Sequence, residues 1–290
     1  MFAGKSGASR LALLVILGLV TLKIAVAVIT GSVSILAQLV DSLLDLVAVT
    51  ITFFAINIAT KPADKEHPFG HGKVESISAA LQALLIFIAA GVIIYSAIDR
   101  IISGAAIEMT EAGIAVMAIS IVVSILLSRH LFRVAKKTES PALEAIAHNI
   151  AADVYSAAGV LVGLTVLRLS GLDFLDPAIA LAVSLVILWS AYKVMRESFS
   201  GLMDARLPED EEKAIEKIIM SHGDRVIGFS NLCTRKSGSQ RYINFNLTMH
   251  KDASLEEVHQ VCDRLEQEIG DELPGAIVTI HVEPSDKEEG

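Results

Sequence analysis

Six apolar segments, each close to the length of a membrane-spanning helix, follow one another in the first two thirds of the chain. They lie at about 11–31, 34–59, 76–99, 112–132, 145–168 and 176–195. A helix needs about 20 apolar residues to cross the hydrocarbon core of a bilayer. Lipid offers no hydrogen-bond partner to the backbone, so only helices and closed barrels can span it. The pattern therefore predicts a membrane domain of six transmembrane helices over residues 1–204.

Residues 205–290 have the composition of a soluble domain. They contain 10 Lys or Arg and 18 Asp or Glu, and so carry most of the net charge of −9. An acidic domain of this kind argues against nucleic acid as a partner, because nucleic-acid binding needs a basic patch. Helix and strand patterns follow in the order αββαβ, at 209–220, 226–235, 241–249, 254–269 and 276–282. This order predicts a small α+β domain of ferredoxin-like type.

Basic residues are distributed unevenly between the ends and connections of the apolar segments. They gather before the first segment, near the second and fourth connections and at the end of the sixth segment, as Lys5, Arg10, Lys61, Lys65, Lys73, Arg129, Arg133, Lys136, Lys137, Lys193 and Arg196. Cytoplasmic loops are enriched in Lys and Arg. Both termini are therefore predicted to lie in the cytoplasm. The absence of a CxxC motif around the two cysteines fits a reducing location for residues 205–290.

Two aspartates stand four residues apart inside the second apolar segment. Between Leu11 and Thr60 the only other charged residue is Lys23. Each carboxylate in the middle of a membrane costs about 2.5–3.5 kcal/mol on insertion scales. Asp41 and Asp45 are at positions i and i+4, so they lie on one face of a helix. Such a pair favours a cation site. The alternatives are a proton path and hydrogen bonds to neighbouring helices.

The fifth segment adds a second polar pair at the same spacing, Asn149 and Asp153. If the second and fifth segments pack together, Asp41, Asp45, Asn149 and Asp153 offer four oxygen-bearing side chains at similar depth. Oxygen ligands of this kind suit a divalent cation. Hydrogen bonds between helices are the alternative role for this pair. His148 is about 140° from Asp153 around the helix and is expected to be a packed polar residue or a proton relay.

The connection between the second and third segments contains Asp64, His67 and His71. Their spacing suits a single metal ion, and imidazole ligands favour zinc, iron or cobalt. An ordinary solvated linker is the alternative.

The soluble part contains a second group of candidate metal ligands. His281 and Glu283 share one face of a strand, and they could hold an ion if His259 lies opposite. Surface histidines without a metal are the alternative. The sequence contains neither an HExxH motif nor a GxxxxGK[ST] loop, so neither a zinc protease nor transport driven by ATP on this chain is expected. We expect no enzymatic activity.

Several motifs, taken in order, resemble the cation diffusion facilitator family, and within it the bacterial ferrous-iron and zinc efflux pump type. They are Thr30-Gly-Ser-Val-Ser-Ile-Leu-Ala37, Val40-Asp-Ser-Leu-Leu-Asp45, Pro62-Ala-Asp64, His67-Pro-Phe-Gly-His-Gly-Lys-Val-Glu-Ser76, Asp153, Leu202-Met-Asp204, Leu207-Pro208 and Thr234-Arg-Lys-Ser-Gly238. The resemblance covers nearly the whole chain.

The resemblance implies a homodimeric exporter of divalent metal ions, coupled to protons, in the bacterial inner (plasma) membrane. Zinc, iron or manganese would be its substrate, with no organic cofactor. Residues 205–290 would form a cytoplasmic domain that binds metal and takes part in dimerisation. The resemblance assigns a transport site to Asp41, Asp45, Asn149 and Asp153. It assigns a loop site to Asp64, His67 and His71. It also implies an interlock between the two domains, formed by Lys73 and Asp204.

The chain departs from the family pattern at several ligand positions. Asn149 stands where zinc-type members usually have histidine, Ser230 and Asn246 replace expected histidines of the soluble site, and Glu283 replaces an aspartate. A transport site of four oxygen ligands should favour harder ions such as Mn²⁺ or Fe²⁺ over Zn²⁺. Two other functions stay open at this point: a passive channel for divalent cations, and a membrane metal sensor that transports nothing.

Overall fold

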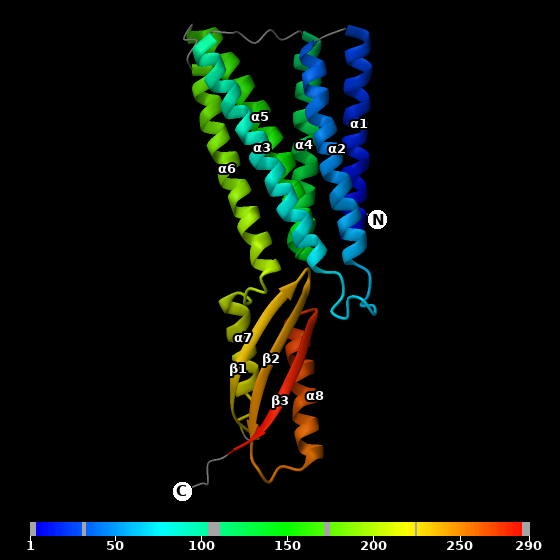
Figure 1. Cartoon of the computed structure of the whole chain (residues 1–290), viewed down its shortest axis with the longest axis vertical. Coiled ribbons are helices and arrows are strands. Elements are labelled where there is room, and N and C mark those ends of the chain that lie inside the picture. The colour runs from blue at the N-terminus through cyan, green and yellow to red at the C-terminus, as the bar shows by residue number, and fades with distance from the viewer. Residues whose placement is uncertain (1–3, 31–32, 104–110, 171–174, 224, 286–290) are drawn as a thin grey trace. The chain divides into compact units, whose positions relative to one another are not determined.

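A computed structural model of the chain contains a bundle of long helices and a small α+β domain (Figure 1). It describes residues 4–30, 33–103, 111–170, 175–223 and 225–285. The chain divides into two compact units, Met1–Phe199 and Ser200–Gly290, and each is considered by itself below.

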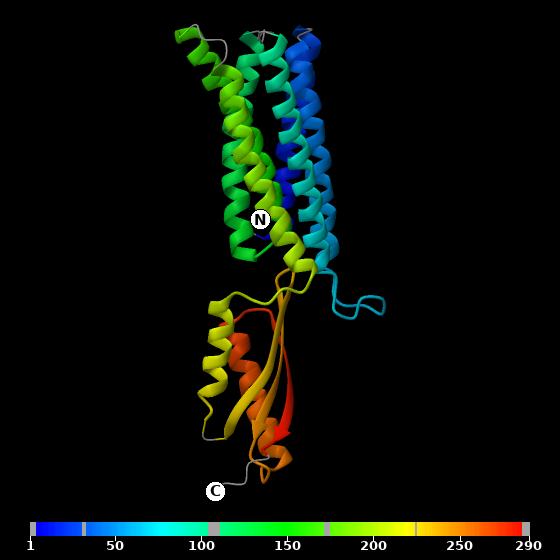
Figure 2. The same cartoon turned by 60° about the vertical axis from the view of Figure 1, so that its left-hand side comes forward.

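The first unit is built from helices that run side by side (Figures 1 and 2). They are α1 (Lys5–Thr30), α2 (Val33–Ala59), α3 (Lys73–Ser103), α4 (Glu111–Thr138), α5 (Pro141–Ser170) and α6 (Leu175–Leu202). Within the described residues, all of them except α5 contain a stretch long and apolar enough to cross a membrane. The last third of α5 lies outside the residues whose side chains are described. The predicted helical membrane fold is confirmed.

The helices extend beyond several of the apolar segments that predicted them. The third segment was expected to end at 99 and the fourth at 132, whereas α3 continues to Ser103 and α4 to Thr138. Polar residues can continue a helix outside the hydrocarbon layer, where water satisfies the last carbonyl groups. Lys136 and Lys137 occupy the last turn of α4, where positive charge is favourable to the helix dipole.

Small residues allow the helices of the bundle to approach one another closely. The main cluster of buried side chains joins α1, α2, α4 and α5 and includes Ala8, Ala12, Ala48, Leu131 and Ile146. Several buried polar side chains in the bundle have hydrogen-bond partners that a membrane interior would not supply. One example is Gln82 on α3, whose Nε2 donates to the Ala48 carbonyl at 2.7 Å and to Thr52 Oγ1 at 3.0 Å.

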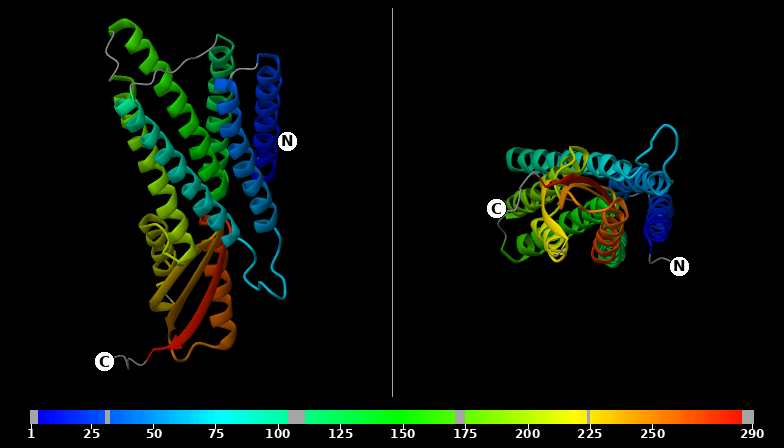
Figure 3. Two further views of the ribbon diagram at one scale, coloured as in Figure 1. Left: turned by 45° about the horizontal axis from the view of Figure 1, so that its top comes forward. Right: turned by 90° about the horizontal axis from the view of Figure 1, so that it is seen from below.

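The second unit has the predicted order αββαβ and confirms the small α+β fold. Its elements are α7 (Glu209–Met220), β1 (Val226–Ser237), β2 (Gln240–Met249), α8 (Leu255–Glu272) and β3 (Ala276–Pro284). The sheet has the order β1-β2-β3, in which β1 pairs with β2 antiparallel and β2 with β3 parallel. Both helices cover the same face of the sheet (Figures 2 and 3), where Ile215, Phe245 and Leu265 meet in a buried core.

Local signals in the sequence explain where these elements begin and end. The β1–β2 turn uses Gly238 at φ +62°, a conformation that glycine adopts without a steric cost. The α8 helix begins with a capping box in which Ser254 and Glu257 satisfy each other's backbone N–H groups. Gly275, at φ +82°, precedes β3 at a position where a Cβ atom would lie 3.0 Å from the Ser239 carbonyl oxygen.

Candidate metal site

The α2 and α5 helices pack against each other and bring the two polar pairs of the membrane segments together. Asn149 Nδ2 on α5 donates a hydrogen bond to Asp45 Oδ1 on α2 at 3.1 Å. The carboxyl group of Asp153, one turn further along α5, is hydrogen-bonded to that of Asp45. Asn149 is buried and Asp45 is partly buried, while Asp41 and Asp153 are exposed on the isolated chain. A cation could therefore reach carboxylates that two different helices supply.

Asp41 completes this group only loosely. Within the described parts of the chain, the three carboxylates of Asp41, Asp45 and Asp153 do not all come within 4.8 Å of one another, whereas Asp64, His67 and His71 do. Carboxylates repel each other when they are ionised. A dication bound between the carboxylates would remove that repulsion.

A cation of the protein itself lies beside the carboxylates. Lys23 on α1 is only 8% exposed, and its Nζ lies 2.6 Å from the Ser42 hydroxyl on α2. Its charge interacts with Asp45, Asp153 and Asp41. Sequence reasoning noted Lys23 as an isolated charge in an apolar segment but gave it no role, because its distance from α2 depends on how α1 packs.

His148 is adjacent to Asn149 in sequence but belongs to a different environment. Its Nδ1 is 2.7 Å from the Ser190 hydroxyl on α6, and its ring meets Phe132 edge-on at 4.8 Å between centroids. In the structure it is a packed polar residue on the side of α5 that faces α4 and α6.

The loop between α2 and α3 arranges the second candidate site. Asp64 Oδ1 accepts hydrogen bonds from the backbone N–H groups of Glu66 at 3.0 Å and His67 at 2.7 Å. The bond from His67 lowers the pKa of the Asp64 carboxyl, which is therefore ionised at neutral pH. The His71 Nε2 lies 3.4 Å from Asp64 Oδ2, and the two imidazole rings are 4.6 Å apart. Two imidazoles around one carboxylate suit a transition metal ion.

The third candidate group is not assembled within one chain. Ser230, Asn246 and His281 form one row across β1, β2 and β3, on the open face of the sheet. Asn246 Nδ2 donates to Glu283 at 2.8 Å, and His281 lies 3.9 Å from the same carboxylate. His259 is on α8, which covers the other face, and its neighbour is Asp263 at 3.5 Å. One chain thus supplies His281 and Glu283 together and His259 apart from them.

The two residues of the expected interlock belong to different units. Lys73 begins α3 in the first unit, and Asp204 lies in the second. Asp204 accepts a hydrogen bond from Arg235 of its own unit at 3.2 Å. The partnership of Lys73 with Asp204 stays a prediction.

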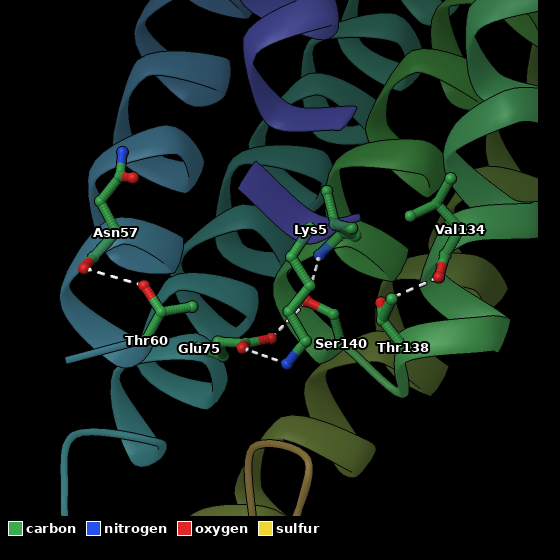
Figure 4. Close-up of polar contacts among 8 residues, drawn as sticks. Lys5, Asn57, Thr60, Glu75, Val134, Thr138 and Ser140 are labelled. Carbon is green, nitrogen blue, oxygen red and sulfur yellow. Dashed lines mark hydrogen bonds and ion pairs between the residues drawn. The ribbon is translucent and has the colours of Figure 1, made fainter. Parts of the chain in front are cut away.

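A buried carboxylate that sequence reasoning missed lies at the start of α3 (Figure 4). Glu75 is 2% exposed. It accepts a hydrogen bond from Lys5 Nζ of α1 at 2.6 Å and another from the hydroxyl of Ser140, just before α5. The sequence held no signal for this contact, because the three residues are far apart along the chain.

Comparison with known proteins agrees with the fold. Residues 9–203 match the model of the cation efflux transmembrane domain, and residues 207–285 match the cytoplasmic domain of cation efflux proteins. An uncharacterised transporter of Synechocystis sp., sll1263, is 35% identical over 263 residues, which are 91% of this chain and 85% of that protein. The cation-efflux pumps FieF of Pectobacterium atrosepticum and Escherichia fergusonii are 35% and 36% identical over 255 residues, or 88% of this chain and 84% of each relative.

The long apolar helices, together with the match to the cation efflux transmembrane domain, define a multi-pass membrane protein of the cation-efflux class. More particularly, the chain belongs to the cation diffusion facilitator family.

Proposed function

We propose that this protein exports a divalent transition metal ion from the cytoplasm of a bacterium in exchange for protons. The observation that carries the proposal is the contact of Asn149 and Asp153 on α5 with Asp45 on α2. Carboxylates inside a membrane are costly, and they mark ion and proton pathways. The relatives named cation-efflux pumps support export as the direction of transport.

The transport site consists of Asp41, Asp45, Asn149 and Asp153. All four ligands are oxygen atoms, since Asn149 offers its amide oxygen. Manganese and ferrous iron fit such a site better than zinc does. Some of the carboxylates carry protons when the metal is absent and exchange them for the ion, so alternating access to the two sides of the membrane couples the two flows.

The remaining sites have supporting roles in this proposal. Residues 1–204 form the transport domain, and residues 205–290 form a cytoplasmic domain through which two chains dimerise. Asp64, His67 and His71 capture an ion at the cytoplasmic surface. Because His259 lies apart from His281 and Glu283 in one chain, an ion bound by all three would need His259 from the second copy. Lys73 and Asp204 link the two domains.

Metal uptake into proteoliposomes tests the proposal. The uptake of Mn²⁺, Fe²⁺, Zn²⁺, Co²⁺, Ni²⁺ and Cd²⁺ by purified protein is measured with and without a pH gradient. Asp45→Asn removes a ligand charge at nearly constant shape, and Asp99→Asn, at an exposed carboxylate of α3, is the matched control. Stimulation by the gradient that is lost only in Asp45→Asn supports an antiporter. Metal flux that does not change with the pH gradient would indicate a channel. Metal binding without any flux would indicate a sensor.

A further inference from the structure

Lys23 is a buried charge that the proposed transport mechanism does not use. It extends from α1 toward α2, where its ammonium group contacts the Ser42 hydroxyl at 2.6 Å. Ser42 follows Asp41 directly and precedes Asp45 by three residues. The α1 helix packs along α2 and also touches α5. Lys23 therefore lies where the two ligand-bearing helices meet.

The charged groups around Lys23 include the proposed ligands of the transport site. Its charge interacts with Asp45, Asp153 and Asp41, and its hydrogen bond to Ser42 is made to a neutral group. A lysine at this depth needs compensation, because an isolated ammonium in a membrane is costly. While no metal is bound, a carboxylate of the site that has not taken up a proton supplies that compensation.

We propose that Lys23 is the built-in counter-charge of the transport site and competes with the metal ion for its carboxylates. This inference rests on the proposed function of that site. A dication that binds Asp45 and Asp153 is repelled by the nearby ammonium, which also loses its own partners. Both effects weaken metal binding, so Lys23 limits affinity and helps a loaded site to release its ion. Lys23 is a positioning residue that acts through the carboxylates and is not itself a ligand, because an ammonium has no lone pair.

Metal uptake by the full chain in proteoliposomes, measured against metal concentration, tests this role. Lys23→Met removes the charge and keeps a long flexible side chain. We expect its apparent KM for Mn²⁺ to fall by about tenfold, because repulsion of a dication inside a protein is strong, and its maximal rate to fall because release is slower. Lys23→Arg keeps the charge, so its KM should stay within about threefold of the wild-type value. That difference is well below the tenfold change expected for Lys23→Met.

Two further variants separate charge from packing. Lys23→Gln is neutral but can still hydrogen-bond Ser42, so it should reproduce the lower KM even if Lys23→Met does not fold. Ser42→Ala removes the hydrogen bond and keeps the charge, and its KM should stay close to that of the wild type. If the wild type transports metal normally but the KM of Lys23→Gln is unchanged or higher, the inference about Lys23 is overturned while the proposed function still stands. A wild-type protein that binds and moves no metal would overturn the proposed function and this inference together.

Discussion

The side-chain Nδ2–H of Asn149 donates a hydrogen bond to Asp45 Oδ1 at 3.1 Å, across the contact between α5 and α2. The amide NH₂ group is a donor only, so the oxygen is the one atom that Asn149 could offer to a cation. In the proposed transport site, the bond to Asp45 would therefore fix the direction in which that oxygen points. The bond also links α5 to α2.

Replacing Asn149 should change the choice of metal. Asn149→His introduces an imidazole nitrogen, a ligand that suits zinc better than manganese. We expect the ratio of Zn²⁺ to Mn²⁺ transport to rise in this variant, measured by uptake into proteoliposomes under one pH gradient. Asn149→Ala is the control for loss of the amide alone. Identical metal profiles of Asn149→His and the wild type would show that this position does not select the ion.

Asn149→His should also change the dependence of transport on pH. An amide does not titrate in the physiological range, whereas an imidazole does. We therefore expect a flatter pH profile in the wild type than in the variant, measured as uptake at a fixed pH difference while both pH values are moved together. A steeper profile in the wild type would contradict the assignment of Asn149 to the site.

The loop site should bind one metal ion per chain independently of transport. His71→Ala and Asp64→Ala each remove one of three ligands, so we expect the number of Zn²⁺ ions bound per chain, measured by equilibrium dialysis, to fall by about one. Lys65→Ala lies in the same loop and changes no ligand, so it is the matched control. The same metal content in His71→Ala and the control would argue for an ordinary surface loop.

Glu212 should make the stability of the second unit depend on pH. It is hydrogen-bonded to Arg206, which lowers the pKa of its carboxyl below the ordinary value of 4.5, and it accepts a hydrogen bond from Thr234 at 2.6 Å. A carboxyl group whose pKa is lowered by folding stabilises the fold at pH values above its ordinary pKa. This contribution is lost as the pH falls through the lowered pKa of the folded state. Glu212→Gln should reduce the free energy of unfolding by about 1–2 kcal/mol at pH 7.

Urea denaturation of residues 200–290, which have a core of their own, checks this over a series of pH values. The difference between Glu212→Gln and the wild type should shrink below pH 4.5. Glu209→Gln breaks an exposed ion pair with Lys213 on the same helix and should cost under about 0.5 kcal/mol. A loss in Glu212→Gln that is equal at every pH would assign the effect to packing.

Two glycines of the second unit should respond in opposite ways to alanine. Gly275 has φ +82°, and a Cβ atom there would press on the Ser239 carbonyl oxygen, so Gly275→Ala should lower the free energy of unfolding by about 1–3 kcal/mol. Gly270 is helical, with nothing within 4 Å of an added Cβ. Gly270→Ala should raise the free energy of unfolding by up to about 1 kcal/mol. The same urea titration measures both, and a neutral Gly275→Ala would show that the turn can relax.

The elements of both units could be predicted from the sequence because each has a local signal. The apolar segments mark the helices, and the Ser254–Glu257 capping box marks the start of α8. The i, i+4 spacing placed Asp41 with Asp45 on one helix face, and Asn149 with Asp153 on another. What could not be predicted is which faces meet. The contacts of Lys23 with Ser42, and of Glu75 with Lys5 and Ser140, depend on helix packing that no single segment encodes.

The buried Glu75 has a mechanical consequence for the alternating access that we propose. One carboxylate holds the first turn of α1, the first turn of α3 and the start of α5 at the same point (Figure 4). A movement that opens the bundle here would strip a buried charge of both its partners, which is far more costly than sliding apolar faces over one another. These three helix ends are therefore expected to travel as one body, with the pivot of the transport cycle at this end of the bundle and the larger displacements at the other.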